Sequence, residues 1–368
     1  MLNVLNKSNL EPKVKKSHEP TSEMWALEYQ GPGKMAYVKK SMPILLKESD
    51  AIVKISKTTI CGTDLHIMKG DLPLVTVGRT LGHEGTGVIE AVGKAVTKFK
   101  VGDLVLISCI TADGTCDSCK KGMYSHCENG GWILGNTIDG TQAEFVRIPY
   151  AETSLYAIPA GCNEEVMVLL SDILPTGFEC GVLNGKVRLG DTVAIVGAGP
   201  IGLAALITAQ FFTPAEIIMI DMDEERLKMS LEFGATRTVN SSEDSYIEKI
   251  MEWTDQRGVD VAIEAVGLPE TFGICQKIIA PGGHIANIGV HGISVDLHLE
   301  KLWDRNITIT TRLVDTATTS MLLKTVKSGK LKPEGLITHR FKLSEVVKAY
   351  EVFGNAEKEK TLKVILSN

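Results

Sequence analysis

The stretch Gly197-Ala198-Gly199-Pro200-Ile201-Gly202 decides the fold of the middle of this chain. It follows Val193–Val196, an apolar run typical of a buried strand, and it opens Ile201–Phe211, which has the composition of a helix. A lone G-x-G-x-x-G pattern is weak evidence, but between a strand and a helix it indicates a dinucleotide-binding turn. The sequence therefore predicts a Rossmann-type unit around this turn.

Each residue of the turn has a physical task. Gly197 permits the tight turn, Gly199 lets the backbone approach a pyrophosphate, and Gly202 allows close packing of the helix on the strand. Pro200 and Ile201 open the helix, whose first amide groups and positive potential suit phosphates. The alternative is a glycine turn that binds no ligand.

Asp221 ends the next apolar strand and argues against that alternative. A carboxylate at this place accepts hydrogen bonds from the adenine ribose diol and repels a 2′-phosphate. We therefore expect NAD rather than NADP as the cofactor. Arg226 could complicate this choice, although its position is more typical of a helix surface.

Strand-like and helix-like stretches alternate around the turn, from about residue 173 to residue 310. This alternation indicates an α/β domain with a doubly wound parallel sheet, because buried parallel strands are continuous apolar runs. The expected strands are Thr192–Val196, Ile217–Asp221, Val261–Ala265 and Gly283–Ile288. The expected helices are Ile201–Phe211, Glu224–Glu232, Ser245–Thr254 and Pro269–Ile279.

Residues 24–172 have a different rhythm, in which short β-rich runs are broken by glycine. This pattern predicts an irregular, barrel-like β domain with strands at Ala51–Ile55, Gly85–Val92, Leu104–Ser108 and Glu144–Ile148. Residues 311–368 contain no dinucleotide motif and end in the strand-like run Lys363–Leu366. We predict that they return to the first domain, so that the α/β unit at 173–310 is an insertion. Residues 1–23, rich in lysine, glutamate and proline, are expected to be a disordered extension, with a targeting or partner-binding arm as the alternative.

Composition excludes several classes of protein. The 368 residues are 44% hydrophobic and 23% charged, with a net charge of −6, so no nucleic-acid footprint is expected. The longest apolar run without charge, Thr192–Gln210, contains glycines and a proline and is better explained by a buried strand, turn and helix than by a membrane span. Four of the eight cysteines lie between residues 109 and 127, which favours metal binding in a reducing compartment over disulfides. We expect a cytoplasmic protein.

A second group of residues carries metal-ligand chemistry. Cys61, His83 and Glu84 supply sulfur, nitrogen and oxygen donors within 24 positions, joined by residues that indicate a loop and a strand edge. This donor set suits zinc, and a zinc with three protein ligands keeps one position open for catalysis. Thr63 and His66 are close enough in sequence to pass a proton away from the site.

These motifs together resemble the zinc-dependent medium-chain alcohol dehydrogenases. The resemblance covers Met24–Asn368 and rests on Cys61–His66, Gly82–Gly87, the cysteine lobe, the glycine turn with Asp221, and Leu170–Gly177. In detail the chain most resembles the branch of secondary-alcohol and formaldehyde-dehydrogenase-like members. The resemblance implies a β domain related to the chaperonin-10 barrel with a Rossmann domain inserted before the C-terminal segment.

The resemblance also supplies residues that spacing alone does not. It places the third catalytic zinc ligand at Asp172, where many members have cysteine, and it leaves open whether Glu84 ligates zinc directly or alternates. Thr176 is expected against the nicotinamide. Gly289 and Val290, which follow a predicted strand, are candidates for contact with the nicotinamide amide, and Lys363 is either a pyrophosphate contact or a solvated surface lysine.

A structural zinc site is expected in the cysteine lobe. Cys116, Cys119 and Cys127 have the tight spacing of a closed site. The family has a further cysteine three positions before the first of them, and here that position is Asp113, whose carboxylate could ligate zinc. Cys109 competes with Asp113 for this role, and a lobe that has lost its metal is the third alternative.

The resemblance implies reversible hydride transfer between NAD and a small primary or secondary alcohol, giving an aldehyde or ketone. Zinc and NAD are the expected cofactors, and Thr63 and His66 are expected to carry the proton. The family forms dimers or tetramers through the edge of the Rossmann sheet near residues 289–299, so a homodimer or homotetramer is expected. Neither nucleic acid nor a membrane is an expected partner.

Three alternatives stay open. The first is a zinc-free quinone reductase on the same fold, which would not need Cys61, His83 and Asp172 together. The second is oxidation of a polyol, of threonine or of a glutathione–formaldehyde adduct, and this depends on pocket residues such as Trp132, Leu134 and Met123. The third is a regulator that binds NAD without catalysis.

Overall fold

A six-stranded, all-parallel sheet forms one half of the molecule. The computed structural model describes residues 22–368, so residues 1–21 of the predicted extension lie outside the described residues. In spatial order the strands are β10 (Arg237–Asn240), β9 (Glu216–Asp221), β8 (Thr192–Val196), β11 (Val259–Glu264), β12 (Ile279–Asn287) and β13 (Thr308–Thr311). Every pair of neighbours in it is parallel. The predicted doubly wound sheet is confirmed.

Side chains alternate between the two faces of this sheet. On β8, Val193 and Ile195 join one buried cluster, whereas Ala194 and Val196 join another. The helices α6 (Pro200–Ala209) and α7 (Glu224–Glu232) pack in the first cluster, and α8 (Tyr246–Trp253) and α9 (Pro269–Ile278) in the second. Both faces are therefore covered, which explains why the strand sequences are apolar without a break. The short helix α10 (Leu299–Leu302) lies in the connection between β12 and β13.

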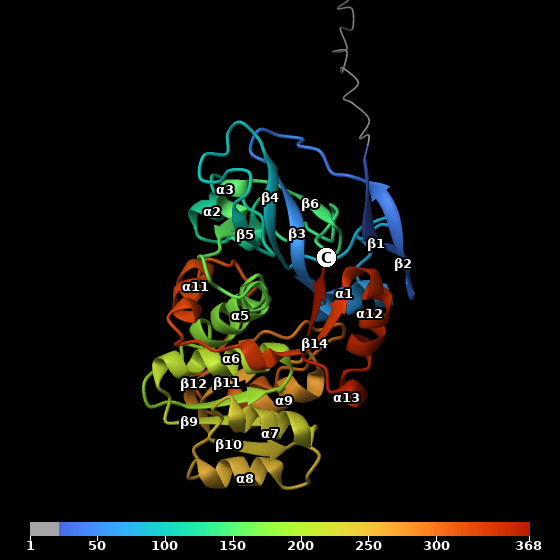
Figure 1. Cartoon of the computed structure of the whole chain (residues 1–368). Coiled ribbons are helices and arrows are strands. Elements are labelled where there is room, and N and C mark those ends of the chain that lie inside the picture. Colours follow the sequence, from blue (N-terminus) through green and yellow to red (C-terminus); the bar gives the residue numbers. More distant parts are fainter. Residues whose placement is uncertain (1–21) are drawn as a thin grey trace, which may run out of the picture.

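A mixed seven-stranded sheet forms the other half, shown uppermost in Figure 1. Its order is β14 (Ile337–Lys342), β15 (Lys363–Ser367), β3 (Ala51–Thr59), β4 (Gly85–Val92), β5 (Leu104–Ile107) and β7 (Leu155–Ala157), and β6 (Phe145–Ile148) pairs with β3. The hairpin of β1 (Glu23–Gly31) and β2 (Lys34–Ser41) packs beside it. The short helices α2 (Asp117–Lys120) and α3 (Ala151–Ser154) lie in its connections.

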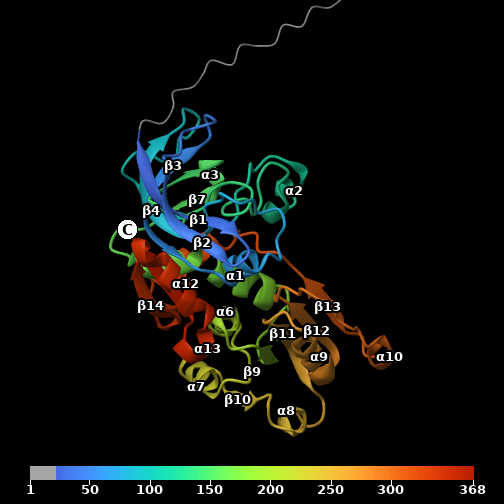
Figure 2. The same cartoon turned by 90° about the vertical axis from the view of Figure 1, so that its right-hand side faces the viewer.

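The C-terminal segment returns to this half, as predicted. β15 pairs with β3 in antiparallel register, with Ile365 opposite Thr59, so residues far apart in sequence are neighbours. Figures 1 and 2 show the red C-terminal elements α12 (Val346–Gly354) and β14 beside the blue β1–β3, while the yellow and orange strands lie below. The helices α11 (Thr319–Lys327) and α13 (Ala356–Glu359) complete the segment. The fold class is confirmed, whereas the domain bounds at 172, 173, 310 and 311 stay predictions.

An apolar helical stretch connects the two halves. It runs through α4 (Glu164–Met167), α5 (Ile173–Thr176) and a π-helical turn at Gly177–Leu183. Residues Glu164–Leu183 are long and apolar enough to span a membrane, yet 89% of the window is buried inside the protein. A Cβ on Gly177 would overlap the backbone of α6, so this stretch packs tightly on the dinucleotide-binding helix. It is a core helix.

Several elements differ from the sequence-based expectation. The Cys61–His66 motif is not a loop, because the helix α1 (Gly62–Lys69) begins directly after Cys61. Asp64 accepts a hydrogen bond from the Cys61 amide at 2.9 Å, which caps the helix, and Gly70 ends it with φ 87°. The edge strands β10 and β13 were not predicted, since they are short and each contains a single apolar residue.

Candidate active site and metal centres

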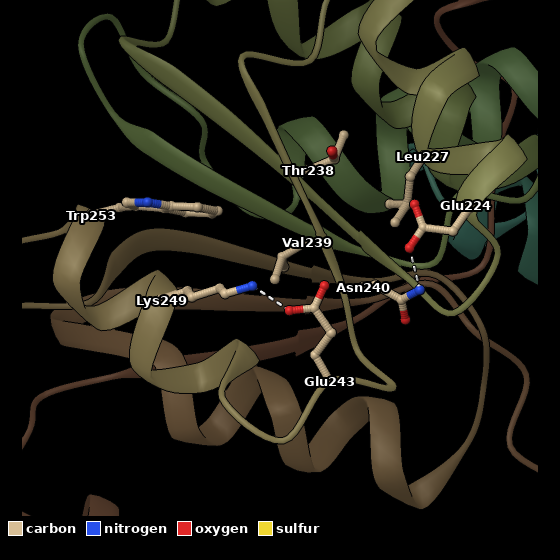
Figure 3. A pocket seen from close by; sticks show the side chains of 8 residues that line it. All are labelled: Glu224, Leu227, Thr238, Val239, Asn240, Glu243, Lys249 and Trp253. Carbon is tan, nitrogen blue, oxygen red and sulfur yellow. Dashed lines mark hydrogen bonds and ion pairs between the residues drawn. The ribbon is translucent and has the colours of Figure 1, made fainter.

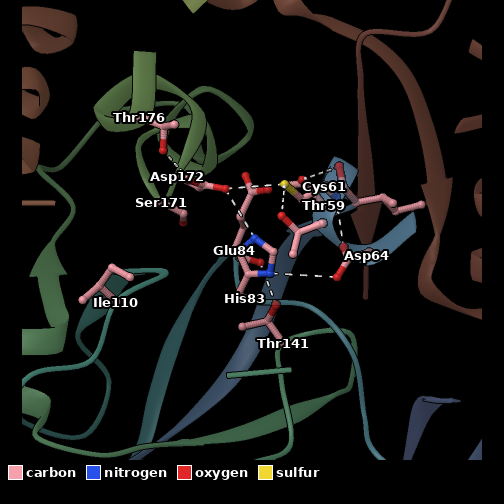
Figure 4. A network of polar contacts seen from close by, with 12 residues as sticks. Thr59, Cys61, Asp64, His83, Glu84, Ile110, Thr141, Ser171, Asp172 and Thr176 are labelled. Atoms are coloured by element: carbon pink, nitrogen blue, oxygen red, sulfur yellow. Dashed lines mark hydrogen bonds and ion pairs between the residues drawn. The ribbon is translucent and has the colours of Figure 1, made fainter. Parts of the chain in front are cut away.

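Four metal-type donors converge where the two halves meet. Cys61 caps α1, His83 and Glu84 precede β4, and Asp172 precedes α5, so three separate elements supply them. The Cys61 Sγ lies 3.5 Å from the Asp172 Oδ2, and the His83 Nε2 lies 3.3 Å from that same oxygen (Figure 4). One ligand atom from each of the four lies within 4.8 Å of the others. The sequence-predicted set is therefore brought together.

The chemistry of this cluster fits a zinc ion. His83, Glu84 and Asp172 are buried, and the Glu84 Oε2 has no hydrogen-bond partner. Burial, together with the Asp172 charge, raises the pKa of the Cys61 thiol. Burial would lower the pKa of His83, but its hydrogen bond to Asp172 and the neighbouring Cys61 raise it instead. A divalent cation would remove the repulsion among these clustered anions, because sulfur, imidazole and carboxylate are the donors that zinc takes.

Asp64 lies behind the histidine, and no role was predicted for it. The Asp64 Oδ1 lies 3.9 Å from the His83 Nδ1, while its Oδ2 accepts from the Cys61 amide and from Gln142 Nε2 at 3.2 Å. At 3.9 Å the approach of Asp64 to His83 is a charge contact and not a hydrogen bond, and the Asp64 carboxylate helps to raise the pKa of His83. The signal was present, since Asp64 lies inside the quoted motif at the third position of a helix.

Glu84 is shared between the donor cluster and a buried lysine. The Lys363 Nζ lies 2.6 Å from the Glu84 Oε1, and both side chains are only 1% exposed. The Lys363 ammonium also donates to the Ile60 carbonyl at 3.2 Å. The solvated-surface alternative for Lys363 is therefore wrong, because its strand β15 is internal to the sheet. A pyrophosphate contact stays untested, as does direct ligation by Glu84.

The predicted proton-carrying residues lie on α1. The Thr63 Oγ1 is 3.8 Å from the Cys61 Sγ, which places the hydroxyl beside the donor cluster. His66 lies one turn further on, half-exposed, with its Nδ1 2.8 Å from the Asp71 Oδ2. Thr176 donates to the Asp172 Oδ1 at 2.6 Å and so orients that carboxylate. Trp132 meets the His83 ring edge-on at 6.0 Å, whereas Leu134 lies in the core of the β sheet and Met123 is exposed.

A second donor cluster occupies the cysteine lobe. Asp113, Cys116, Cys119 and Cys127 bring one ligand atom each within 4.8 Å of one another, so this set also fits zinc. Burial raises the pKa of Cys119 to about 12, whereas the hydrogen bond from Asn129 lowers the pKa of Asp113 below its usual range. Cys109 belongs instead to a buried apolar cluster with Ile110, Cys180 and Val314, so its candidacy is wrong.

The glycine turn has the backbone that a dinucleotide needs. Gly197 has φ 105°, and a Cβ on Gly202 would overlap the Gly197 carbonyl oxygen. Gly199 is the N-cap of α6, with Pro200 and Ile201 in the first turn. Asp221 ends β9, and its Oδ2 accepts from the Ala198 amide at 2.6 Å. Arg226 lies near Asp223 at 3.8 Å, as expected for a residue on the surface of α7.

Gly289 and Val290 follow β12 at the same end of the sheet as this turn. Their backbone packs on Gly267 in the loop after β11, since a Cβ on either glycine would overlap the other loop. Val290 is 63% exposed, so its side chain is free to meet a ligand.

A separate pocket opens at the β10 edge and does not belong to this site. Its volume is about 300 Å³, and it lies among α7, β10 and α8 (Figure 3). Glu243 pairs with Lys249, and Asn240 donates to Glu224, so its polar side chains satisfy one another. We assign it no ligand.

Comparison with known proteins identifies the family. Residues 47–160 match the alcohol dehydrogenase GroES-like domain, and residues 200–328 match the zinc-binding dehydrogenase family. An alcohol dehydrogenase of Cupriavidus necator is 34% identical over 94% of this chain and 99% of its own length. The chain belongs to the zinc-dependent medium-chain alcohol dehydrogenases. The resemblance of the motifs is thus confirmed for the family, while the branch within it is not established.

A solved structure agrees with this membership. The apo form of zinc dependent alcohol dehydrogenase 2 from Streptococcus pneumonia is 55% identical, with a TM-score of 0.90, over 94% of this chain and 98% of that one. The protein has zinc-dependent alcohol dehydrogenase activity on small alcohols or carbonyl compounds and uses a nicotinamide cofactor. An isopropanol dehydrogenase of Entamoeba histolytica, 30% identical over 89% of this chain and 92% of its own length, is named NADP-dependent. Membership therefore leaves the choice between NAD and NADP open.

Proposed function

We propose that the protein is an NAD-linked dehydrogenase of primary or secondary alcohols. The carboxylate of Asp221 at the end of β9 carries the choice of NAD, because a 2′-phosphate there would meet a fixed negative charge. Arg226 does not offset that charge, since it lies near Asp223. The proposed pyrophosphate contacts are Gly197–Gly202, and the proposed nicotinamide contacts are Thr176, Gly289 and Val290.

Cys61, His83 and Asp172 are the proposed ligands of the catalytic zinc, which as a bound Lewis acid lowers the pKa of an alcohol and steadies negative charge on its oxygen. Thr176 orients Asp172 by a hydrogen bond, and the Asp64 charge lies 3.9 Å behind His83, so each ligand has a partner outside the cluster. Glu84 binds Lys363 through its Oε1, so its Oε2 is the oxygen proposed as an additional zinc donor.

Thr63 and His66 are the proposed route for the proton. The Thr63 hydroxyl is beside the Cys61 sulfur, inside the site, and His66 is half-exposed on the same helix. Since no hydrogen bond joins the two residues, the cofactor ribose is the proposed bridge between them. Asp71 accepts from the His66 Nδ1, which leaves the other ring nitrogen for the exchange.

The cysteine lobe is proposed to hold a structural zinc on Asp113, Cys116, Cys119 and Cys127. All four donors are used, so no position stays open, as is usual for structural sites. A cytoplasmic location agrees with eight cysteines that form no disulfide among the described residues.

A homodimer or homotetramer is proposed through the β13 edge of the parallel sheet. Trp303 is 77% exposed, and Ile293, Leu297 and Leu299 are also exposed in the same connection from β12 to β13. β13 itself, Thr308–Thr311, carries no charge to discourage edge pairing. An apolar patch beside an open, uncharged edge is typical of a contact between subunits.

One assay tests the cofactor and substrate together. Reduction of NAD and of NADP would be followed with primary alcohols, secondary alcohols and polyols, with and without a zinc chelator. We expect NAD to be preferred, simple alcohols to outperform polyols, and the chelator to abolish activity. Asp221→Asn keeps the shape of the side chain and removes its charge, so it should raise the NADP to NAD ratio of kcat/KM about tenfold, the effect of roughly 1.4 kcal/mol. A preference for NADP in the unmodified protein, or an unchanged ratio in the variant, would contradict the proposed role of Asp221 in selecting NAD.

A further inference from the structure

A buried carboxylate fastens the loop after β12 to the end of β11. Glu264 is the last residue of β11 and is 0% exposed. Its backbone carbonyl accepts from the amides of Ile288 at 2.8 Å and Gly289 at 3.3 Å. Its side-chain Oε1 accepts from the Gly267 amide at 2.8 Å, so a single residue binds both loops at this end of the sheet.

The second oxygen of Glu264 faces a histidine. The Glu264 Oε2 is buried without a hydrogen-bond partner and lies 3.6 Å from the His291 Nε2. No lysine or arginine pairs with Glu264 among the described residues, so His291 is the only basic group placed to balance it. The ring of Phe272 on α9 meets the imidazole edge-on at 6.2 Å and fixes its plane.

Asn287 connects His291 to the backbone of the loop after β12. The His291 Nε2 lies 2.8 Å from the Asn287 Oδ1, and the Asn287 Nδ2 donates to the Gly289 carbonyl at 2.9 Å. Since the Asn287 amide nitrogen is the donor toward Gly289, its oxygen accepts from the N–H of His291. Glu264, His291 and Asn287 thus form a chain of contacts that ends on the Gly289 carbonyl.

Glycine packing leaves this loop little room to shift. A Cβ on Gly289 would overlap the Glu264 Oε2 and the Gly267 amide nitrogen, and a Cβ on Gly267 would overlap the Val290 carbonyl. The two loops therefore touch backbone to backbone. The tether and the close packing hold the polar backbone groups of Gly289 and Val290 in one arrangement.

We propose that His291 and Asn287 are positioning residues for the nicotinamide half of the cofactor. The inference rests on the proposed function, in which Gly289 and Val290 contact the nicotinamide amide. Neither side chain needs to touch the cofactor, because both act through the Gly289 backbone. A loop that is already ordered loses less entropy on binding, so the tether strengthens cofactor binding.

The test compares two ligands that differ by the nicotinamide riboside. NADH and ADP-ribose would be titrated calorimetrically into the full-length protein and into His291→Ala and Asn287→Ala. We expect the Kd for NADH to rise about tenfold in both variants, the effect of one or two lost hydrogen bonds, while the Kd for ADP-ribose changes less than about twofold. His291→Gln, which keeps an N–H donor toward Asn287, should recover part of the loss.

His339→Ala is the matched control, because His339 lies on β14 in the other half of the molecule and its ring bonds to Thr338. It should leave both affinities unchanged. An unchanged NADH affinity in His291→Ala, or an equal loss for NADH and ADP-ribose, would overturn the positioning role. If the unmodified protein binds neither ligand, the proposed NAD-linked function fails, which is a separate result.

Discussion

Three of the metal-type donors each have a polar or charged partner outside the cluster. The Asp64 charge faces His83, Thr176 donates to Asp172, and Lys363 pairs with Glu84. Each of these three partners is a hydrogen-bond or charge partner of a donor. They lie on three different elements, α1, α5 and β15. The donor cluster is therefore set before any ligand arrives, which is the arrangement that a metal site needs to select its geometry.

His66 gives the sharpest test at this scale. His66→Ala should lower kcat by on the order of 100-fold near neutral pH, a typical contribution of a general base, and less in alkaline solution, where hydroxide replaces it. Pre-steady-state proton release and the pH profile of kcat are the measurements, and added imidazole should restore part of the rate. Asp71→Asn should give a smaller loss, because it removes only the charge beside the His66 Nδ1. An unchanged pH profile in His66→Ala would contradict the proton route.

Sequence patterns were informative at some of these residues and not at others. Cys61, His83 and the glycine turn were found because their chemistry depends on residue type and spacing. Asp172 came only from family resemblance, since it is 111 positions from Cys61 and nothing local marks it. The burial of Lys363 was not predictable, because it depends on β15 lying between β14 and β3.

Helices and strands were predicted best where a regular pattern of apolar residues covered the whole element. The expected Glu224–Glu232 helix matches α7, and the expected Thr192–Val196 strand matches β8. The π-helical turn at Gly177–Leu183 and the helix α1 were missed. α1 has only eight residues, and its start depends on the Asp64 cap rather than on an amphipathic pattern.

The structural zinc site proposed for the cysteine lobe can be tested by removing one of its ligands. Cys116→Ser should lower the zinc content from two ions per chain to one and lower Tm by roughly 5 °C, while the catalytic zinc stays. Elemental analysis and thermal unfolding measure both effects. Cys162→Ser, at a partly buried thiol outside both clusters, is the control and should change neither. A zinc content near one in the unmodified protein would contradict the structural site.

At the scale of the whole molecule, the apolar patch beside β13 should govern assembly. Trp303→Asp is expected to turn the proposed oligomer into a monomer, because it places a charge among the exposed apolar side chains. Analytical ultracentrifugation of both proteins measures this. Leu189→Asp, at an equally exposed leucine on another connection, should leave the oligomer intact. A monomeric unmodified protein would contradict the proposed contact.

The pairing of β15 with β3 has a consequence for biosynthesis. The parallel sheet, residues 192–311, is contiguous in sequence and can fold as soon as it leaves the ribosome, whereas β3 must wait for β15, about 300 residues later. Glu84 stays an unpaired acid until Lys363 arrives on that strand. The ion pair of Glu84 is therefore completed last, although all four donors precede the parallel sheet in sequence, so a nascent chain would form its nucleotide-binding sheet before the charge of Glu84 is balanced.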